Sequence, residues 1–281
     1  MGIKGLHKGL AFCTKKGNIS DYRGKSVAVD ASSWLHKSVY SCSEIYVESL
    51  ERRQVDSHSV RVSSNYIINR CKELLNCFHL SRIYLTMDGK RCPLKANESR
   101  EREERRRQNL KEAHEFKRLG FNDKAVQKYQ MCIKIRDDFT IAVMKLVQRE
   151  FIYDKRVELV WSPYEADAQL AKLCIDQQAN AVITEDSDVL VYSAAAKFSF
   201  PVLFKLDRGT GTCDIISMDW LLTPGHQPTT QKKKPGVLEA LLYNLASREA
   251  RRPGFGVRLF CQACVLAGCD YAPNSLPGVG L

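Results

Sequence analysis

The chain has 281 residues, with 43 Lys or Arg against 32 Asp or Glu, so its formal net charge is +11. No run of about 18 apolar residues is present, which excludes a membrane-spanning helix, and the first residues are too polar for a secretory signal. The eleven cysteines are odd in number and scattered, which indicates reduced thiols rather than a disulfide framework. The basic charge favours a polyanionic partner such as nucleic acid, because Lys and Arg displace counterions from phosphates.

Short apolar runs alternate with amphipathic patterns along most of the chain. Five of the runs predict buried strands, at residues 25–30, 81–88, 157–161, 181–184 and 202–206. Helical periodicity lies between them, at residues 65–78, 139–150 and 164–177. Strands that alternate with helices predict an α/β fold whose central, mostly parallel sheet is flanked by helices.

Two stretches interrupt this alternation. Residues 90–118 hold eleven Lys or Arg against six Glu, which is typical of a solvated helix with ion pairs between residues four apart. Residues 223–256 are rich in Pro, Gly and Lys, which predicts a loop insertion. Within it, the apolar patch "VLEALLYNLA" predicts one short helix.

Acidic residues follow several predicted strands. Asp30 and Asp88 end two of them, and Asp186 and Asp188 follow a third in "AVITEDSDVLVY". In an extended segment, residues two apart point to the same face, so Asp186 and Asp188 should converge while Glu185 points away. Because sites in parallel sheets form beyond the carboxyl ends of the strands, this placement predicts a functional site there.

A second acidic pair, Glu165 and Asp167, lies in "SPYEADAQL". Ser162 there is suited to cap a helix, Pro163 to its first position and Glu165 to the capping-box position, so a structural role for Glu165 stays open. Asp167 has no such capping role. Near the end of the chain, Asp270 follows an apolar run in "LAGCDY".

Carboxylates gathered at one sheet edge need counter-charge, from protons or from cations. Hard oxygen ligands favour Mg²⁺ or Mn²⁺, and two such ions roughly 4 Å apart suit phosphodiester hydrolysis. Other readings are weaker: "DSD" alone is a weak glycosyltransferase signal, the EF-hand spacing fails, and no Walker A sequence is present. Cys261 and Cys264 have zinc-like spacing but lack a second pair, so buried helix cysteines are favoured.

The motifs "MGIKGL", "VAVD", "MDG", "PYEADAQLA", "TEDSDVL" and "GCDY" occur in this order over almost the whole chain. With them the chain resembles the eukaryotic 5′ nuclease family of flap endonucleases and their relatives, which has a PIN/resolvase-like nuclease core. "WLHK" at residues 34–37, and Asp rather than Glu at position 167, are similar to the 5′→3′ exonuclease branch of that family.

The resemblance implies roles for residues in the matching motifs. The ligands of two Mg²⁺ ions, for which Mn²⁺ can substitute, would be Asp30, Asp88, Glu165, Asp167, Asp186, Asp188 and Asp270. A helical arch would carry two catalytic cations that grip the scissile phosphate, Lys95 and Arg102, which lie seven residues apart and therefore on one helical face. The DNA-binding residues would be Gly2, His36, Lys37, Arg91, Arg105 and Arg106, with His36 stacking on a flipped 5′ nucleotide.

The last residues, "NSLPGVGL", resemble the first turn of the family's helix–two-turn–helix, which binds K⁺ and duplex backbone. Ser275 and Val279 would then contact K⁺. Since the second helix of that motif does not follow before Leu281, the resemblance predicts a fragment or truncated chain with reduced duplex affinity and processivity.

The resemblance also divides the chain into regions. They are an N-terminal nuclease region (1–99), a basic helical arch (90–135), an internal nuclease region (136–222), the Lys/Pro-rich insertion (223–256), and the last metal ligand with the incomplete helix–two-turn–helix (257–281).

The expected function is Mg²⁺-dependent, structure-specific hydrolysis of DNA at or near 5′ ends, as a 5′→3′ exonuclease on duplexes and a 5′ flap endonuclease. DNA with a 5′ end, gap or flap would be the partner, with no membrane, in mismatch repair or recombination in the nucleus. Mismatch-repair proteins or a sliding clamp would bind through C-terminal sequence absent here. Two alternatives stay open: a replication-type flap endonuclease, and a DNA-binding scaffold with an inactive nuclease core.

Overall fold

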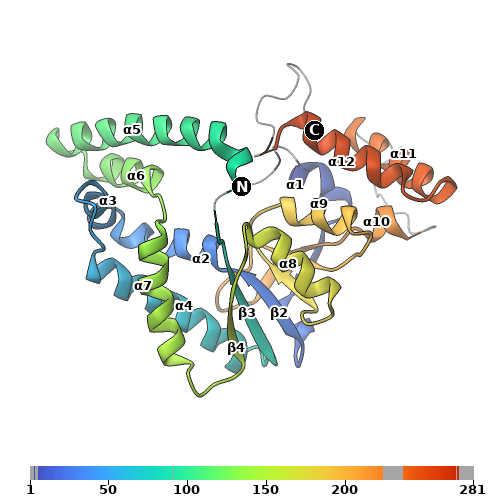
Figure 1. Cartoon of the computed structure of the whole chain (residues 1–281), viewed down its shortest axis with the longest axis horizontal. Helices are drawn as coiled ribbons and strands as arrows, with labels where there is room; N and C mark the ends of the chain where they lie inside the picture. The colour runs from blue at the N-terminus through green and yellow to red at the C-terminus, as the bar shows by residue number, and fades with distance from the viewer. Residues whose placement is uncertain (1–2, 4–5, 91, 224–236, 270, 272–281) are drawn as a thin grey trace.

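The computed structural model in Figure 1 describes residue 3 and residues 6–90, 92–223, 237–269 and 271. Its centre is a seven-stranded sheet in the order β1-β7-β6-β5-β2-β3-β4. The strands are β1 (Lys15–Asn18), β2 (Ser26–Asp30), β3 (Arg82–Met87), β4 (Val157–Trp161), β5 (Ala181–Ile183), β6 (Val202–Phe204) and β7 (Thr212–Ile216). The predicted α/β class with a mostly parallel sheet is confirmed.

The five predicted strands are β2 to β6, and they pair in parallel. The apolar runs of β2, β3, β5 and β6 reflect burial on both faces, whereas the edge strand β4 is only partly buried. The sequence reading missed β1 and β7, which pair antiparallel with each other, β7 also with β6. The sequence "KKGN" of β1 is polar and half exposed, so it carries no apolar signal.

Helices cover both faces of the sheet (Figure 1). The α-helices are α1 (Leu6–Gly9), α2 (Ala31–Ser38), α3 (Ser43–Glu51), α4 (Ser57–Asn76), α5 (Ala96–Arg118), α6 (Asn122–Cys132), α7 (Asp137–Glu150), α8 (Ala166–Ile175), α9 (Asp188–Ala195), α10 (Asp219–Leu222), α11 (Val237–Arg251) and α12 (Phe255–Ala267). Short 3₁₀ helices are η1 (Leu10–Cys13), η2 (Ile19–Tyr22), η3 (Tyr40–Cys42) and η4 (Pro93–Lys95). None of the described helices is long and apolar enough to cross a bilayer.

Alternate side chains of each central strand pack into two separate hydrophobic cores. Val27 and Val29 of β2 point into the core formed with α2, α3, α4 and α7, whereas Ala28 points into the core formed with α8 to α12. This period of two follows from the pleat of the strand. The two cores fix the sheet from both sides and leave its edge at the carboxyl ends of the parallel strands free for a site.

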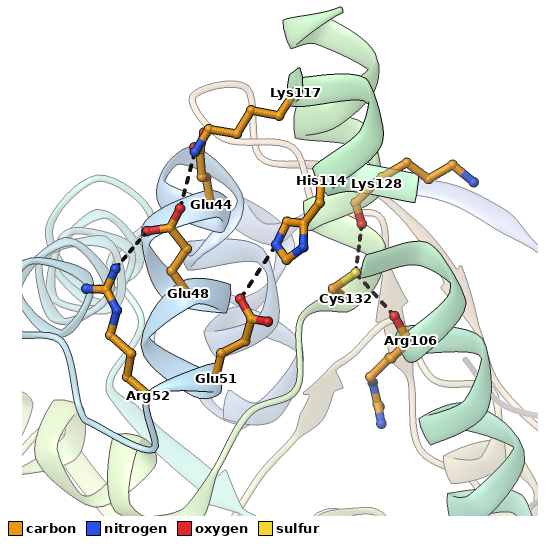
Figure 2. Close-up of polar contacts among 9 residues, drawn as sticks. All are labelled: Glu44, Glu48, Glu51, Arg52, Arg106, His114, Lys117, Lys128 and Cys132. Carbon is orange, nitrogen blue, oxygen red and sulfur yellow. Dashed lines mark hydrogen bonds and ion pairs between the residues drawn. The ribbon is translucent and has the colours of Figure 1, made fainter. Parts of the chain in front are cut away.

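Helices α5 and α6 lie side by side and extend away from that edge (Figure 1). At the far end of α5, polar contacts attach it to the acidic face of α3, as Figure 2 shows: Lys117 bonds Glu44 and Glu48, and His114 lies 3.6 Å from Glu51. On the other side, the Cys132 sulfur of α6 lies 3.5 Å from the main-chain oxygen of Arg106 in α5 and 3.2 Å from that of Lys128 in its own helix. Exposed ion pairs contribute little singly, so this attachment should weaken with salt.

The expected insertion at residues 223–256 contains more structure than predicted. Helix α11 occupies residues 237–251 and packs with α12 on the second core through Leu242 and Leu245, while residues 224–236 lie outside the described ranges. The helix predicted at "VLEALLYNLA" is confirmed, and it extends to 15 residues. The division of the chain into functional regions stays a prediction.

Gly89 joins the end of β3 to the end of β4. Its amide donates to the Tyr164 carbonyl oxygen at 2.6 Å, and a Cβ there would overlap the Ser162 carbonyl oxygen and lie 2.9 Å from that of Pro163. Only a residue without a side chain allows this approach of two backbones.

We therefore expect Gly89→Ala to destabilise the fold by about 2 kcal/mol or more, because backbone cannot move aside as a side chain can. Urea unfolding measures this. Gly17→Ala is the matched control, because the atom closest to its Cβ is the flexible end of Ile215, and its cost should be clearly smaller. Equal costs for both variants would contradict the proposed constraint.

Candidate active site

Parallel pairing of β2 with β3 and β5 brings acidic residues to one edge of the sheet. Asp30 is the last residue of β2, and its register partner in β3 is Thr86, two positions before Asp88. Asp186 and Asp188 follow β5, the other neighbour of β2. The strand order thus joins acids that are far apart in sequence.

Asp30 is buried and held by hydroxyl groups. Its carboxylate caps α2 by accepting from the Ser33 amide at 3.2 Å, and it also accepts from the Ser33 and Thr184 hydroxyls at 2.5 and 3.0 Å. Burial nevertheless raises the pKa of Asp30 to about 6, with the charge of Asp88 adding to the rise and the Ser33 bonds opposing it.

The carboxylate of Asp88 caps the start of α8, a role that the sequence analysis assigned to Ser162. The amide of Ala166 donates to the Asp88 carboxylate at 2.9 Å, so this helix is capped by a residue from β3's end rather than by Ser162. Glu165 is itself the N-cap residue but makes no capping bond with its side chain. Its carboxylate instead pairs with Lys95, at 2.6 Å, so the capping-box interpretation of Glu165 is wrong.

The segment after β5 is a turn rather than an extended strand. Asp188 is the first residue of α9, its amide donates to the Asp186 carboxylate at 3.0 Å, and its own carboxylate accepts from the Ile3 amide at 2.8 Å. The alternation argument for Asp186 and Asp188 was therefore wrong, although both acids lie at the site. Glu185 points elsewhere and pairs with Lys37 at 2.8 Å.

Asp167 lies in the first turn of α8, where the charges of other carboxylates disfavour its ionisation. Burial raises its pKa well above the usual range, and the charges of the surrounding acids add to the rise. In decreasing order these are Asp186, Asp30, Asp188 and Asp88. Five carboxylates from separate parts of the chain are thus close enough to disfavour one another's ionisation.

Hard oxygen donors of this kind suit Mg²⁺ or Mn²⁺. Within the described residues, however, no group of three or more His, Cys, Asp or Glu side chains is arranged to hold a metal ion. Hydrogen bonds explain part of this: Asp88 is held by Ser32 and Ala166, and Glu165 by Lys95. The donor chemistry fits a divalent ion, and loading would require these side chains to turn.

The basic helix α5 borders a second feature, a hollow of about 670 Å³ beneath it. Its lining includes His36, Tyr40, Arg102, Arg105 and Arg106. The His36 ring makes an edge contact with Tyr40, with centroids 5.5 Å apart, and burial followed by the charge of Arg106 lowers the pKa of His36. Arg105 and Arg106 pair with Glu101 and Glu103 at 3.8 and 3.6 Å, consistent with the alternative of an ion-pair surface.

Some predicted site residues cannot be placed. Those that lie outside the described residues are Gly2, Arg91, Asp270, Ser275 and Val279. Conversely, the sequence reading missed Tyr271, whose hydroxyl donates to Glu165, and Tyr192, whose hydroxyl is 3.2 Å from that of Tyr271. The only available signal was the place of Tyr271 directly after Asp270 in "GCDY".

Two regions of the chain match models of known protein families: the XPG N-terminal domain over residues 1–109 and the XPG I-region over residues 156–270. Together they contain the strands and the acids described above. The chain belongs to the XPG family of 5′ nucleases.

Among curated proteins, the chain is similar to Exonuclease 1 of Oryza sativa subsp. japonica and of Arabidopsis thaliana, each at 29% identity over 100% of this chain. The chain spans only 28% and 32% of those two proteins. Among solved structures, the catalytic core of Rad2 in complex with DNA substrate aligns over 100% of this chain and 64% of its own, with a TM-score of 0.60 and 17% identity. Flap endonuclease-1 from Methanococcus jannaschii aligns over 99% of this chain and 74% of its own, with a TM-score of 0.54 and 17% identity.

Neutralising Asp167 tests the repulsion directly. We expect metal-free Asp167→Asn to melt about 2–5 °C above the unmodified chain at pH 8, because it removes the least favourable charge. Because the pKa of Asp167 is raised, its ionised form destabilises the folded chain and its protonated form does not. The unmodified chain should therefore regain stability as the pH falls, and the difference in melting temperature between the two chains should shrink. Thermal melts in EDTA at several pH values measure this. A less stable variant at pH 8 would contradict the repulsion.

Proposed function

We propose that this chain is a divalent-metal-dependent, structure-specific 5′ nuclease that hydrolyses DNA phosphodiester bonds at or near 5′ ends. The expected activities are 5′→3′ exonuclease action on duplex DNA and cleavage of 5′ flaps. The observation that carries the proposal is the gathering of four carboxylates around that of Asp167 at the sheet edge where the basic helix α5 begins. A binding module would gain nothing from negative charge that faces phosphate.

The proposed ligands are the seven acids named from the sequence. When bound, Mg²⁺ would activate a water molecule and neutralise the leaving oxygen, and Mn²⁺ can substitute. The arrangement of protein groups supports this use: the Ser33 and Thr184 hydroxyls orient Asp30, and Ser32 orients Asp88. Such supporting bonds hold ligand oxygens in place.

The chain's cations would bind the substrate. Lys95, at the base of the arch, already lies 2.6 Å from the carboxylate of Glu165, so its ammonium is placed to contact a phosphate that approaches the ligands. Arg102 lines the hollow beneath α5 together with His36 and Tyr40. Aromatic rings and arginines beside such a hollow suit an unpaired nucleotide, because stacking tolerates any base.

Further parts of the proposal rest on the resemblance and the relatives' names. K⁺ would bind at Ser275 and Val279, and the reaction would serve DNA repair, including mismatch repair, in the nucleus. Rad2 was solved in complex with a DNA substrate, which supports DNA as the partner here. Mismatch-repair proteins or a sliding clamp would be further partners of the whole protein.

Removing one ligand tests the active site. Asp186→Ala should lower Mg²⁺-dependent cleavage of a 5′-labelled recessed duplex by about 100-fold or more, since the ion loses a charged ligand. Asp176→Ala is the control, because this exposed acid at the end of α8 pairs with Lys172, and neither residue is assigned to the site. It should retain nearly full activity. Unchanged Mg²⁺-dependent cleavage by Asp186→Ala would refute this active site.

Two comparisons separate the alternatives. Rates on recessed 5′ ends against 5′ flaps distinguish an exonuclease from a replication-type flap endonuclease, which would strongly prefer flaps. A DNA-binding scaffold with inactive chemistry would bind either substrate in Mg²⁺ without cleaving it.

A further inference from the structure

Four side chains from distant parts of the chain form one cluster near the start of α5. They are Lys95 of η4, Glu165 before α8, Tyr192 of α9 and Tyr271 after α12. The Lys95 ammonium lies 2.6 Å from one oxygen of Glu165, and the Tyr271 hydroxyl donates to the other. The same ammonium lies 4.6 Å from the centre of the Tyr271 ring.

The direction of the hydrogen bonds can be deduced. A phenol has a single proton, and that of Tyr271 is donated to Glu165. Across the 3.2 Å between the two hydroxyls, Tyr192 must therefore donate to Tyr271. The chain of bonds runs from Tyr192 through Tyr271 to Glu165 and fixes the orientation of this carboxylate. Burial raises the pKa of both phenols, which keeps the two protons in place.

At least two attractions hold Lys95 at this place. The carboxylate of Glu165 attracts it directly, and the ring of Tyr271 attracts it through its π face. The Lys95 and Glu165 side chains are only 19% and 17% exposed, so solvent screens these attractions little. If an ion takes the carboxylate of Glu165, the ring still holds the ammonium beside the ligands.

We propose that Tyr271 is a positioning residue for the nuclease reaction: its ring holds Lys95 over the site, and its hydroxyl, supported by Tyr192, keeps one oxygen of Glu165 in place while the other oxygen turns from Lys95 to metal. The inference rests on the proposed function. The ring and the hydroxyl of Tyr271 can be tested separately. Loss of the ring should affect Lys95, and loss of the hydroxyl alone should affect Glu165.

Single-turnover cleavage of a recessed duplex, with the DNA dissociation constant measured in parallel, tests the ring. Tyr271→Leu should cut slower by about 3- to 30-fold, the range of a cation–π contact, while DNA affinity stays within about twofold. Tyr271→Phe keeps the ring and should lose less. The additional loss from Tyr271→Phe to Tyr271→Leu should disappear in the Lys95→Ala background, because the ring and Lys95 contribute to the same interaction.

Mn²⁺ titration followed by electron paramagnetic resonance tests the hydroxyl without cleavage. Tyr271→Phe should bind Mn²⁺ about tenfold more weakly, and Tyr192→Phe should shift binding in the same direction by less. Tyr153→Leu, at a tyrosine that is 94% exposed, is the surface control and should change neither measurement. If Tyr271→Leu does not fold, the two Phe variants decide the question.

The outcomes distinguish the inference from the proposed function. If Lys95→Ala slows cleavage but Tyr271→Leu does not, or if Tyr271→Phe leaves Mn²⁺ binding unchanged, the role of Tyr271 is overturned. Parallel losses of melting temperature, DNA affinity and rate in Tyr271→Leu would show a merely structural role and also overturn it. If Lys95→Ala itself cleaves normally, the assignment of Lys95 in the proposed function fails instead.

Discussion

Electrostatic repulsion among carboxylates at the carboxyl edge of the parallel sheet is the constraint on which the rest of the site depends. The strand order brings Asp30, Asp88 and the acids after β5 together, and α8 adds Asp167 in their midst. Folding tolerates this because hydroxyls and amides bind several of the oxygens, and because Lys95 neutralises Glu165. Without cations, burial and then the charges of neighbouring acids raise the pKa of Asp167 and of Asp30.

The basic helix and the acidic edge are two parts of one arrangement. Helix α5 starts beside the acids and reaches away to α3, where Lys117 and His114 attach its far end (Figure 2). A polyanion drawn to α5 would therefore meet the carboxylates at the base of the helix, where divalent ions can separate the two negative groups. The Lys95–Glu165 pair describes the metal-free protein: a cation of the chain itself neutralises a carboxylate that we propose as a metal ligand.

The sequence alone predicted the fold class and the five parallel strands; burial on both faces makes β2, β3, β5 and β6 apolar runs, whereas the edge strand β4 is only partly buried. The sequence could not predict β1 and β7, whose pairing depends on tertiary contacts rather than on an apolar pattern. At the site, chain position identified the acids, but local geometry differed: Asp88 replaces the expected Ser162 cap, and Asp188 opens a helix. Tyr271 and Tyr192 gave no pattern, since their role depends on four elements meeting in space.

The most direct test of this account is the position of bound metal. Crystals of the chain grown with Mn²⁺ should show two anomalous-scattering peaks roughly 4 Å apart at the sheet edge, with oxygens of Asp30, Asp167 and Asp186 among the ligands. The Glu165 carboxylate should then have turned from Lys95 toward an ion. Peaks elsewhere on the chain, or none at saturating Mn²⁺ with these carboxylates still bonded only to protein groups, would contradict the account.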